Sequence, residues 1–308
     1  MTYHADLPVI VQIETAMACN LRCPMCPVPT AKTEMDGRAV GVMPVETFEL
    51  IMAQLAGKQR VIGLTMMGEP LINKHIARFV RIAREHGHYV ALTTNATLLT
   101  EQKSRALLDA GLNMLKVSFD GATRETFERI RVGAKFDQVV ENVVRFDALR
   151  REVGSDCQLE VHCIESDLTR NELDAFRAMW TGIADTPRTI QLSDWLGQMS
   201  LPPEFGTPAG ALAPYSSKGC HLLWDVLSIS ETGRPVYCCF DYKMTSGLPS
   251  VHEKPLLDTW NDDIAAERQR HVENRVNGGP CARCPTWLRV KEHKKAELQS
   301  RVPHDLVA

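Results

Sequence analysis

Short apolar runs alternate with amphipathic segments along most of the chain. Six of the runs are rich in β-branched and other aliphatic residues, as expected of buried strands, and they cover residues 9–16, 60–68, 89–95, 114–121, 157–165 and 189–195. The segments between them have the apolar spacing of helices, over residues 44–57, 72–87, 100–111, 123–152 and 170–180. Strands joined by crossover helices form a parallel sheet, and right-handed crossovers curl that sheet. The pattern therefore predicts an α/β fold built as a full or partial barrel.

Residues at the ends of these helices support the assignment. Thr100 stands where a side-chain N-cap is expected, and Gly87 and Gly111 follow helical segments at positions that suit a left-handed C-cap. Ligands of such α/β folds bind at the carboxyl ends of the strands. We therefore expect the chemistry of this protein at that edge of the sheet.

The alternation ends after Trp195. Residues 196–218 are rich in Pro, Gly and Ser, which indicates a linker or lid. Residues 219–290 then predict a small second unit, with a hairpin, a helix over 256–275 and a loop that contains "CARC". The hairpin turn, "ETGR", has Gly233 where a positive φ is wanted. We expect one large domain followed by a small one.

The composition is that of an ordinary globular protein. Of its 308 residues, 44% are hydrophobic and 24% charged, and the formal net charge is -3. Because no basic stripe or run of like charges is present, neither a nucleic acid nor a membrane surface is an expected partner. The first residues do not have the pattern of a signal peptide, and no uncharged apolar stretch approaches the roughly 20 residues that span a bilayer. We expect a cytoplasmic protein.

Three cysteines near the N-terminus have the spacing of metal ligands. Ten cysteines in a protein of a reducing compartment favour metal binding or catalysis over disulfides. Cys19, Cys23 and Cys26 form a C-x3-C-x2-C pattern after the first predicted strand, and thiolates at such spacing select zinc or iron–sulfur clusters. A structural zinc site needs four protein ligands, and no further Cys or His follows nearby. Three thiolates suit a four-iron cluster whose fourth iron is open to an exogenous ligand.

Together with three later motifs, this loop resembles the radical S-adenosylmethionine (SAM) superfamily. "MMGEPL", after the second predicted strand, is similar to the family's GGE motif, with Gly68 and Glu69 in place and Met where the first Gly is common. The resemblance implies that the backbone of this stretch, with Glu69 nearby, meets the amino group of SAM. "TTN", which ends at Asn95, and "VSFDG", which contains Ser118, stand at the third and fourth strand ends. By the same resemblance they contact the cofactor, with Ser118 at its ribose or carboxylate.

The resemblance covers residues 9–195 and implies a partial (β/α)6 barrel. It also implies that a [4Fe–4S] cluster on Cys19, Cys23 and Cys26 chelates SAM through its open iron. One electron from the reduced cluster would cleave SAM to methionine and a 5'-deoxyadenosyl radical, which takes a hydrogen atom from an unactivated C–H bond of the substrate. We expect a flavodoxin- or ferredoxin-type protein as the electron donor.

Four cysteines in the last third form a second candidate ligand set. Cys220 and Cys238 belong to the pattern C-x12-G-x4-C, and Cys281 and Cys284 to C-x2-C. By spacing alone, a second four-iron cluster and a structural zinc are equally suited. Next to a radical SAM motif, the pattern resembles the SPASM and twitch domains, and the lack of later cysteines resembles the twitch form with one auxiliary cluster. Such a cluster, fully ligated by protein, would transfer electrons or serve only as a structural staple.

Cys239 is required by neither ligand set and is a candidate catalytic thiol. In related sulfatase-maturing enzymes the residue at this position is an Asp, proposed to deprotonate the substrate. A thiol here could return a hydrogen atom to a substrate radical from the opposite face and invert a stereocentre, as a cysteine does in epimerases of this wider group. Cys239 could also be a packing residue or an alternative ligand. Asp241 is the second catalytic candidate, as a base.

Three reactions therefore remain open. The first is epimerisation, with Cys239 as hydrogen donor, of a polar small molecule such as an amino sugar or aminocyclitol in natural-product biosynthesis. The second is dehydrogenation of a secondary alcohol, with Asp241 as base and the auxiliary cluster as electron acceptor, by analogy with twitch-containing cyclitol dehydrogenases of aminoglycoside pathways. The third is peptide modification, and a cluster-bearing protein without activity is the non-enzymatic interpretation. An amine on the substrate is suggested because Asp194, Glu160 and Asp241 could pair with an ammonium group.

Overall fold

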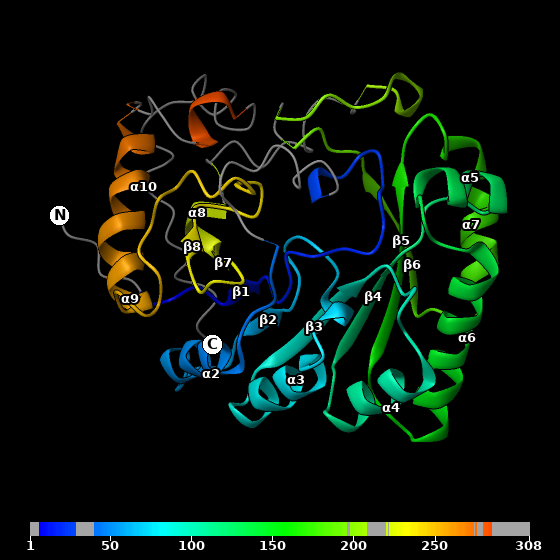
Figure 1. The fold of residues 1–308 in the computed structure, drawn as a ribbon, viewed down its shortest axis with the longest axis horizontal. Helices are drawn as coiled ribbons and strands as arrows, with labels where there is room; N and C mark the ends of the chain where they lie inside the picture. The colour runs from blue at the N-terminus through cyan, green and yellow to red at the C-terminus, as the bar shows by residue number, and fades with distance from the viewer. Residues whose placement is uncertain are drawn as a thin grey trace.

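Six parallel strands follow one another across the sheet of this protein, each joined to the next by a helical crossover (Figure 1). The computed structural model describes residues 6–28, 40–195, 198–207, 220, 222–273, 275 and 280–284. The strands are β1 (Ile10–Ile13), β2 (Val61–Gly63), β3 (Tyr89–Thr94), β4 (Met114–Ser118), β5 (Gln158–Glu165) and β6 (Thr186–Gln191). They pair in sequence order, and the sheet does not close on itself. The predicted partial (β/α)6 barrel is confirmed.

Helices cover the outer side of the curved sheet (Figure 1). They are α2 (Val45–Gln54), α3 (Ile76–Glu85), α4 (Glu101–Asp109), α5 (Arg124–Ile130), α6 (Phe136–Glu152) and α7 (Leu173–Trp180). Their apolar faces share one buried core with strand residues such as Leu115 and Val117. Thr100 caps α4 by accepting a hydrogen bond, 3.3 Å long, from the backbone N–H three residues on. Gly87 and Gly111 have φ values of +80° and +84°, as the sequence predicts for helix ends.

The single helix predicted over residues 123–152 is in fact two helices. Between α5 and α6 the chain turns at Gly133, which has a φ of +100°. The carbonyl of Val132 accepts a hydrogen bond of 2.9 Å from the backbone N–H of Arg22, in the cysteine loop. The break between the helices coincides with this tertiary contact, so the apolar periodicity of the sequence does not reveal it. The break places Arg131 beside the N-terminal cysteines.

The hairpin of the second unit extends the sheet of the barrel. β7 (Val226–Ile229) runs parallel to β1 and pairs antiparallel with β8 (Pro235–Val236). Gly233 in the hairpin turn has a φ of +75°, as predicted, and a Cβ there would lie 2.8 Å from the Thr47 methyl group on α2. The hairpin is thus continuous with the barrel, although the sequence pattern suggests a separate unit. The domain boundaries at residues 195 and 219 stay predictions.

The rest of the second unit is mainly helical. It comprises α8 (Leu222–Asp225), α9 (Leu256–Asp258), a π-helical turn (Thr259–Asp263) and α10 (Ile264–Val272), followed by a 3-10 turn (Pro280–Arg283). The helix predicted over 256–275 is confirmed in its place. Of the predicted linker, only residues 198–207 are described. The first strand of the hairpin begins at Val226, directly after α8.

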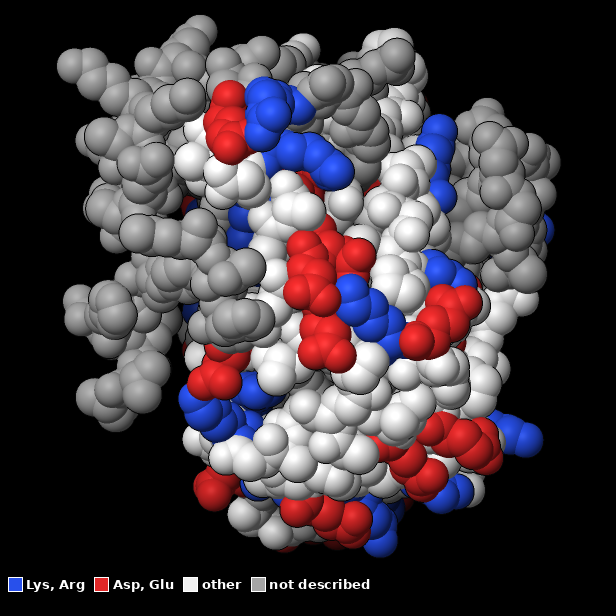
Figure 2. Space-filling model, turned by 90° about the vertical axis from the view of Figure 1, so that its left-hand side faces the viewer, with Lys and Arg blue, Asp and Glu red and all other residues white. Residues whose placement is uncertain are grey.

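Charges of both signs are mixed on the face of the molecule that includes α10 (Figure 2). On that side Lys254 pairs with Asp262 at 3.0 Å and with Asp263 at 2.7 Å. Within the described ranges, none of the helices is long and apolar enough to cross a membrane.

Candidate functional site

The three N-terminal cysteines share one site in the loop that follows β1. Cys23 is buried, Cys19 and Cys26 are partly buried, and the thiols lie close enough for their charges to interact. Burial, with a smaller effect of the two neighbouring thiols, raises the pKa of Cys26 to about 12. The backbone N–H of Leu21 donates a hydrogen bond to Cys19 Sγ at 3.4 Å. A cluster of iron ions relieves the repulsion between crowded thiolates, so this set fits a [4Fe–4S] cluster with three protein ligands.

Gly68 brings the loop after β2 against the cysteine loop. Its φ is +67°, and a Cβ at this position would lie only 2.1 Å from the carbonyl oxygen of Ala16 and 2.8 Å from that of Ala18. The N–H of Glu69 donates to the Ala18 carbonyl at 2.7 Å. Only glycine therefore permits this approach of the two loops.

Glu69 ties the same loop to the end of β3. Its Oε1 accepts hydrogen bonds from the Leu71 N–H at 3.0 Å and the Thr94 hydroxyl at 2.6 Å, and its Oε2 accepts one from the Asn95 N–H at 2.7 Å. Burial raises the pKa of Glu69, and these hydrogen bonds oppose the rise. Both oxygens are engaged within the protein, so Glu69 positions the loop. Its expected place near the amino group of SAM stays a prediction.

Asn95 and Ser118 stand at the strand ends where the sequence places them. The Asn95 amide donates to Asn20 Oδ1 at 3.1 Å and lies 3.9 Å from Cys19 Sγ. Ser118 is partly exposed at the end of β4 and pairs in register with His162 of β5. Asn95 is thus a neighbour of the cysteine site itself. Contact of either residue with the cofactor stays a prediction.

Arg131 is a member of this site that sequence reasoning missed. Its Nη2 lies 2.6 Å from Asp120 Oδ2, and its Nη1 lies 4.0 Å from Cys23 Sγ. Asp120 is held in turn by the Ile164 N–H, which donates to Oδ1 at 2.6 Å. The signal in the sequence was weak, because Arg131 lies inside the helical segment predicted over residues 123–152 and belongs to no metal-ligand pattern.

The four C-terminal cysteines also gather at one place. Cys220, Cys238, Cys281 and Cys284 are all partly or fully buried, and the charge of Cys220 acts on both Cys238 and Cys281. Cys284 in turn acts on Cys220 and Cys281. Burial raises the pKa of Cys220 to about 11 and that of Cys238 well above its ordinary value. Four converging thiols fit a cluster ligated entirely by protein.

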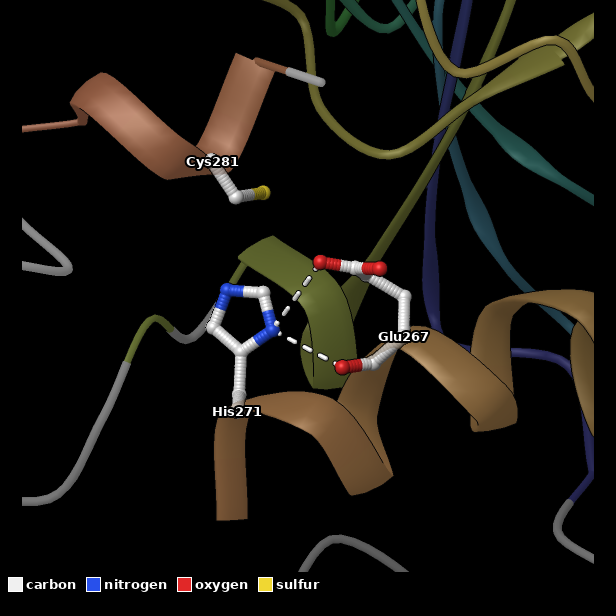
Figure 3. A group of neighbouring side chains, drawn as sticks. All are labelled: Glu267, His271 and Cys281. Carbon is white, nitrogen blue, oxygen red and sulfur yellow. Dashed lines mark hydrogen bonds and ion pairs between the residues drawn. The ribbon is translucent and has the colours of Figure 1, made fainter. Parts of the chain in front are cut away.

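Two polar residues of α10 face this cysteine set (Figure 3). One ligand atom from each of Glu267, His271 and Cys281 lies within 4.8 Å of the other two, and all three residues are buried. His271 Nδ1 is 2.8 Å from the Glu267 carbonyl oxygen and 3.4 Å from its Oε1. Because Cys281 also belongs to the four-cysteine set, we interpret Glu267 and His271 as polar neighbours of that set.

The two catalytic candidates differ in their surroundings. Asp241 is fully buried, and its two oxygens accept four hydrogen bonds from the backbone and hydroxyl groups of Thr245 and Ser246. Such a carboxylate stabilises a turn and has no oxygen left for a substrate proton. Cys239 is partly exposed, and its sulfur makes no hydrogen bond to another described residue. Its role stays a prediction, as does that of Asp241, which this geometry disfavours.

Tyr242 joins the C-terminal segment to the first cysteine site. It packs in a small buried cluster beside Cys19 and Cys26. The Trp195 ring meets Tyr242 edge-on at 6.1 Å and donates its N–H to the Met25 carbonyl at 2.9 Å. Tyr242 lies in the turn that directly follows the turn of Cys238, so this short segment links the two cysteine sites.

Two family models match the chain. The model of the radical SAM superfamily matches residues 13–156, and the model of SPASM, an iron–sulfur cluster-binding domain, matches residues 220–285. Their positions agree with the barrel and with the two cysteine sites. The fold and sites are those of an α/β protein with two iron–sulfur centres. The chain belongs to the radical SAM superfamily and has a C-terminal SPASM-type domain.

These two domains imply SAM and two [4Fe–4S] clusters as cofactors. The three-cysteine loop fits the first cluster because it leaves one iron open for SAM. The four-cysteine set fits the auxiliary cluster because it supplies a complete shell of thiolates.

Curated relatives align with less than half of the chain. GTP 3',8-cyclase of Chlorobaculum tepidum is 40% identical over 135 residues, which cover 42% of this chain and 38% of the relative. PqqA peptide cyclase of Rhodopseudomonas palustris is 31% identical over 128 residues, which cover 40% and 32%. The match thus spans about a third of the length of these relatives.

Solved structures resemble a larger share of the chain. SuiB of Streptococcus suis, bound to the precursor peptide SuiA, has a TM-score of 0.67 and 16% identity, covering 92% of this chain and 71% of SuiB. BtrN in complex with AdoMet and 2-DOIA has a TM-score of 0.56 and 18% identity, covering 87% of this chain and 90% of BtrN. At these identities the likeness concerns the fold alone.

Proposed function

We propose that this protein is a radical SAM enzyme that inverts a stereocentre of a polar small molecule, such as an amino sugar or aminocyclitol of natural-product biosynthesis. Its substrate would bind in the barrel, below the cofactor-binding loops. A hydrogen atom would leave one face of a carbon, and Cys239 would return a hydrogen atom to the other face.

The hydrogen atoms and electrons of this reaction can be traced through Cys239 and the two cluster sites. When bound, SAM and the first cluster supply the one-electron chemistry that breaks the substrate C–H bond. The S–H bond of Cys239 then breaks, its hydrogen atom adds to the substrate carbon, and a sulfur radical remains. One electron from a flavodoxin- or ferredoxin-type donor and one proton from water restore the thiol. Cys238, next in the chain, is a predicted ligand of the auxiliary cluster, so this electron has a short path.

The contrast between Cys239 and Asp241 carries the proposal. Dehydrogenation through Asp241 requires a carboxylate that accepts a substrate proton, but all four hydrogen bonds of Asp241 hold a turn. Returning a hydrogen atom requires a thiol that keeps its hydrogen. Burial raises the pKa of the Cys239 thiol to about 12, so the S–H bond is retained at neutral pH, and Cys239 is not needed by either ligand set.

The variant Cys239→Ala tests the hydrogen donor. Reconstituted wild type and variant would be incubated anaerobically in deuterated water with SAM, a reductant and a panel of amino sugars and aminocyclitols, and the products analysed by mass spectrometry. We expect the wild type to place a single solvent deuterium in the epimer. The variant should still form 5'-deoxyadenosine from SAM but no epimer.

Cys157→Ala is the matched control, because Cys157 is a thiol at the amino end of β5, away from both cysteine sets. It should retain epimer formation. Epimer formed by Cys239→Ala at the wild-type level would refute the donor role. A wild-type product lighter by two hydrogens would instead establish the alternative, dehydrogenation of a secondary alcohol with the auxiliary cluster as electron acceptor.

Peptide modification is the further alternative. Its support is that PqqA peptide cyclase is among the relatives and that SuiB was solved with a precursor peptide. The amine suggested for the substrate has less support than the sequence pattern indicated. Asp241 and Glu160 are engaged by other side chains, and Asp194 remains of the three proposed carboxylates.

A further inference from the structure

The inner face of the barrel carries a positive charge on β4 that no described residue pairs with. Successive residues of a strand point to opposite sides of a sheet. Leu115 and Val117 are fully buried in the core that the helices share, whereas Lys116 and Ser118 alternate with them and are partly exposed. Lys116 therefore projects to the side away from the helices, which is the concave side of the partial barrel.

Three residues on the next two strands surround this lysine. Lys116 pairs in register with Glu160 of β5, and His162, two residues further along β5, pairs with Arg188 of β6. The two oxygens of Glu160 are both engaged, because Oε2 lies 2.9 Å from His162 Nε2 and Oε1 lies 3.2 Å from Arg188 Nε. The carboxylate that is nearest in register to Lys116 thus already has two partners.

The side chain of Lys116 makes no hydrogen bond or ion pair with any residue that the structure describes. Its charge and that of Arg188 both act on the His162 ring, so the two cations border the same place. Burial lowers the pKa of His162, and the two cations lower it further against the opposing effect of Glu160. With a neutral imidazole, this group has two positive charges and one negative charge.

The position of these charged residues relative to the cofactor site indicates that they would contact the substrate. A strand rises about 3.3 Å per residue, so Lys116 lies roughly 7 Å deeper in the barrel than Ser118. Just beyond Ser118, Asp120 pairs with Arg131, which borders Cys23. The residues predicted to contact SAM all stand at the strand ends. The cations lie one layer below them, where a substrate under attack would extend.

We propose that Lys116 and Arg188 bind an anionic group of the substrate, a phosphate or a carboxylate. This inference rests on the proposed hydrogen-atom abstraction and names a chemical feature of its substrate. A partly buried ammonium without a counter-charge among the described residues gains strongly from an anion, because Coulomb attraction grows as water is excluded. The planar guanidinium of Arg188 adds a fork of donors that matches two oxygens of either group.

Anion binding to the holoenzyme tests the proposal without the substrate. Protein reconstituted with both clusters and saturated with SAM would be titrated calorimetrically with inorganic phosphate and, separately, with sodium acetate at constant ionic strength. We expect one or both to bind. Lys116→Gln should weaken that binding about tenfold, and Lys116→Arg, which retains the charge, by less than about threefold. Lys58→Gln is the matched control, because Lys58 is an exposed lysine paired with Asp6, and it should bind like the wild type.

Three results would overturn the proposal. The first is equal anion affinity of wild type and Lys116→Gln. The second is equal loss in Lys116→Arg and Lys116→Gln, because charge would then not be the determinant. The third is a weakening of SAM binding by Lys116→Gln, measured without added anion, as large as that of anion binding, because the lysine would then serve the cofactor. The proposed function fails on a different result, namely that reduced wild type with SAM forms no 5'-deoxyadenosine.

Discussion

Arg131 places a positive charge beside a ligand of the first cluster. Burial works against its charged form, but the nearby negative charges of Asp120 and Cys23 raise the pKa of Arg131 above its ordinary value. The guanidinium therefore stays positive at any pH at which the protein is folded. A reduced cluster has one more negative charge than an oxidised one, and a nearby cation stabilises that reduced state.

We predict that Arg131→Gln lowers the reduction potential of the first cluster. The shift is about 60 mV for each 1.4 kcal/mol of stabilisation lost by the one-electron reduced state, and it would be measured by redox titration with electron paramagnetic resonance. Arg131→Lys retains the charge and keeps Asp120 paired, so it should shift the potential less. Arg129→Gln, at an exposed arginine 3.6 Å from Glu204, is the control. An unchanged or higher potential in Arg131→Gln would contradict the electrostatic role.

Gly68 offers a second test at the scale of one residue. Gly68→Ala should separate the loop after β2 from the cysteine loop, because the added methyl group would overlap the Ala16 carbonyl. We expect a loss of about 1–3 kcal/mol from backbone strain, together with less iron per chain after reconstitution. The control is Gly87→Ala, whose φ is also positive but whose Cβ would meet nothing within 4 Å. Iron analysis and thermal unfolding measure both effects, and equal iron content in the two variants would exclude the loop contact.

The residues that could be predicted from the sequence are those whose spacing is local. Cys19, Cys23 and Cys26 are close in the chain, and their ligand pattern needs no tertiary information. Arg131 lies 108 residues from Cys23 in the chain, and no local pattern links them. The hydrogen bonds of Asp241 could not be predicted from the sequence either. An Asp near a candidate catalytic thiol could cap a turn or serve as a base, and the sequence does not distinguish the two.

At the scale of elements, helix α10 supplies polar neighbours to the auxiliary site. Glu267 is a negative charge beside Cys281, and the resulting repulsion is one of the causes that raise the Cys281 pKa, after burial. The same helix contributes His271, which is held by the Glu267 carbonyl (Figure 3). A helix that packs two such residues against a ligand acts on the electronic properties of the site it supports.

We predict that Glu267→Gln raises the reduction potential of the auxiliary cluster, because it removes a negative charge next to a predicted ligand. Arg270 pairs with Glu267 at 2.7 Å and partly compensates it, so the shift should be smaller than that of Arg131→Gln. The potential would be measured in a Cys19→Ala/Cys23→Ala/Cys26→Ala background. Asp262→Asn, an exposed carboxylate just before α10, is the control. A lower potential in Glu267→Gln would refute the argument.

The elements of the barrel could be predicted because each strand and helix has its own hydrophobic period. Two departures have a tertiary cause. The helix expected over residues 123–152 breaks where Val132 bonds to the cysteine loop. β7 pairs with β1 although more than 200 residues separate them, and periodicity does not specify which edge a distant hairpin will join. In both cases the sequence predicted the helical stretch or the hairpin, but not the distant segment that it contacts.

At the scale of the whole molecule, the two cluster sites are parts of one structure. β7 continues the barrel sheet, Gly233 rests on α2, and Tyr242 packs beside Cys19 and Cys26. The C-terminal unit has a short hairpin and few helices, so its order depends strongly on the ligands that hold it. The main hydrophobic core extends into this unit, but most of its buried residues belong to the barrel. We therefore expect that loss of one cluster affects the other site to a different extent in the two directions.

We predict that loss of the auxiliary cluster impairs the first site, but not the reverse. Cys281→Ser/Cys284→Ser should lose the second cluster, release the turn that contains Tyr242, and weaken SAM binding at the intact first loop. Cys19→Ala/Cys23→Ala/Cys26→Ala should lose SAM binding but retain an auxiliary cluster. Iron and sulfide analysis, with equilibrium binding of SAM, would measure both. Tyr242→Ala separates the contact from the cluster, because it should weaken SAM binding while both clusters remain. Wild-type affinity for SAM in Cys281→Ser/Cys284→Ser would show that the two sites are independent, because the Tyr242 contact would then have no effect on the cofactor.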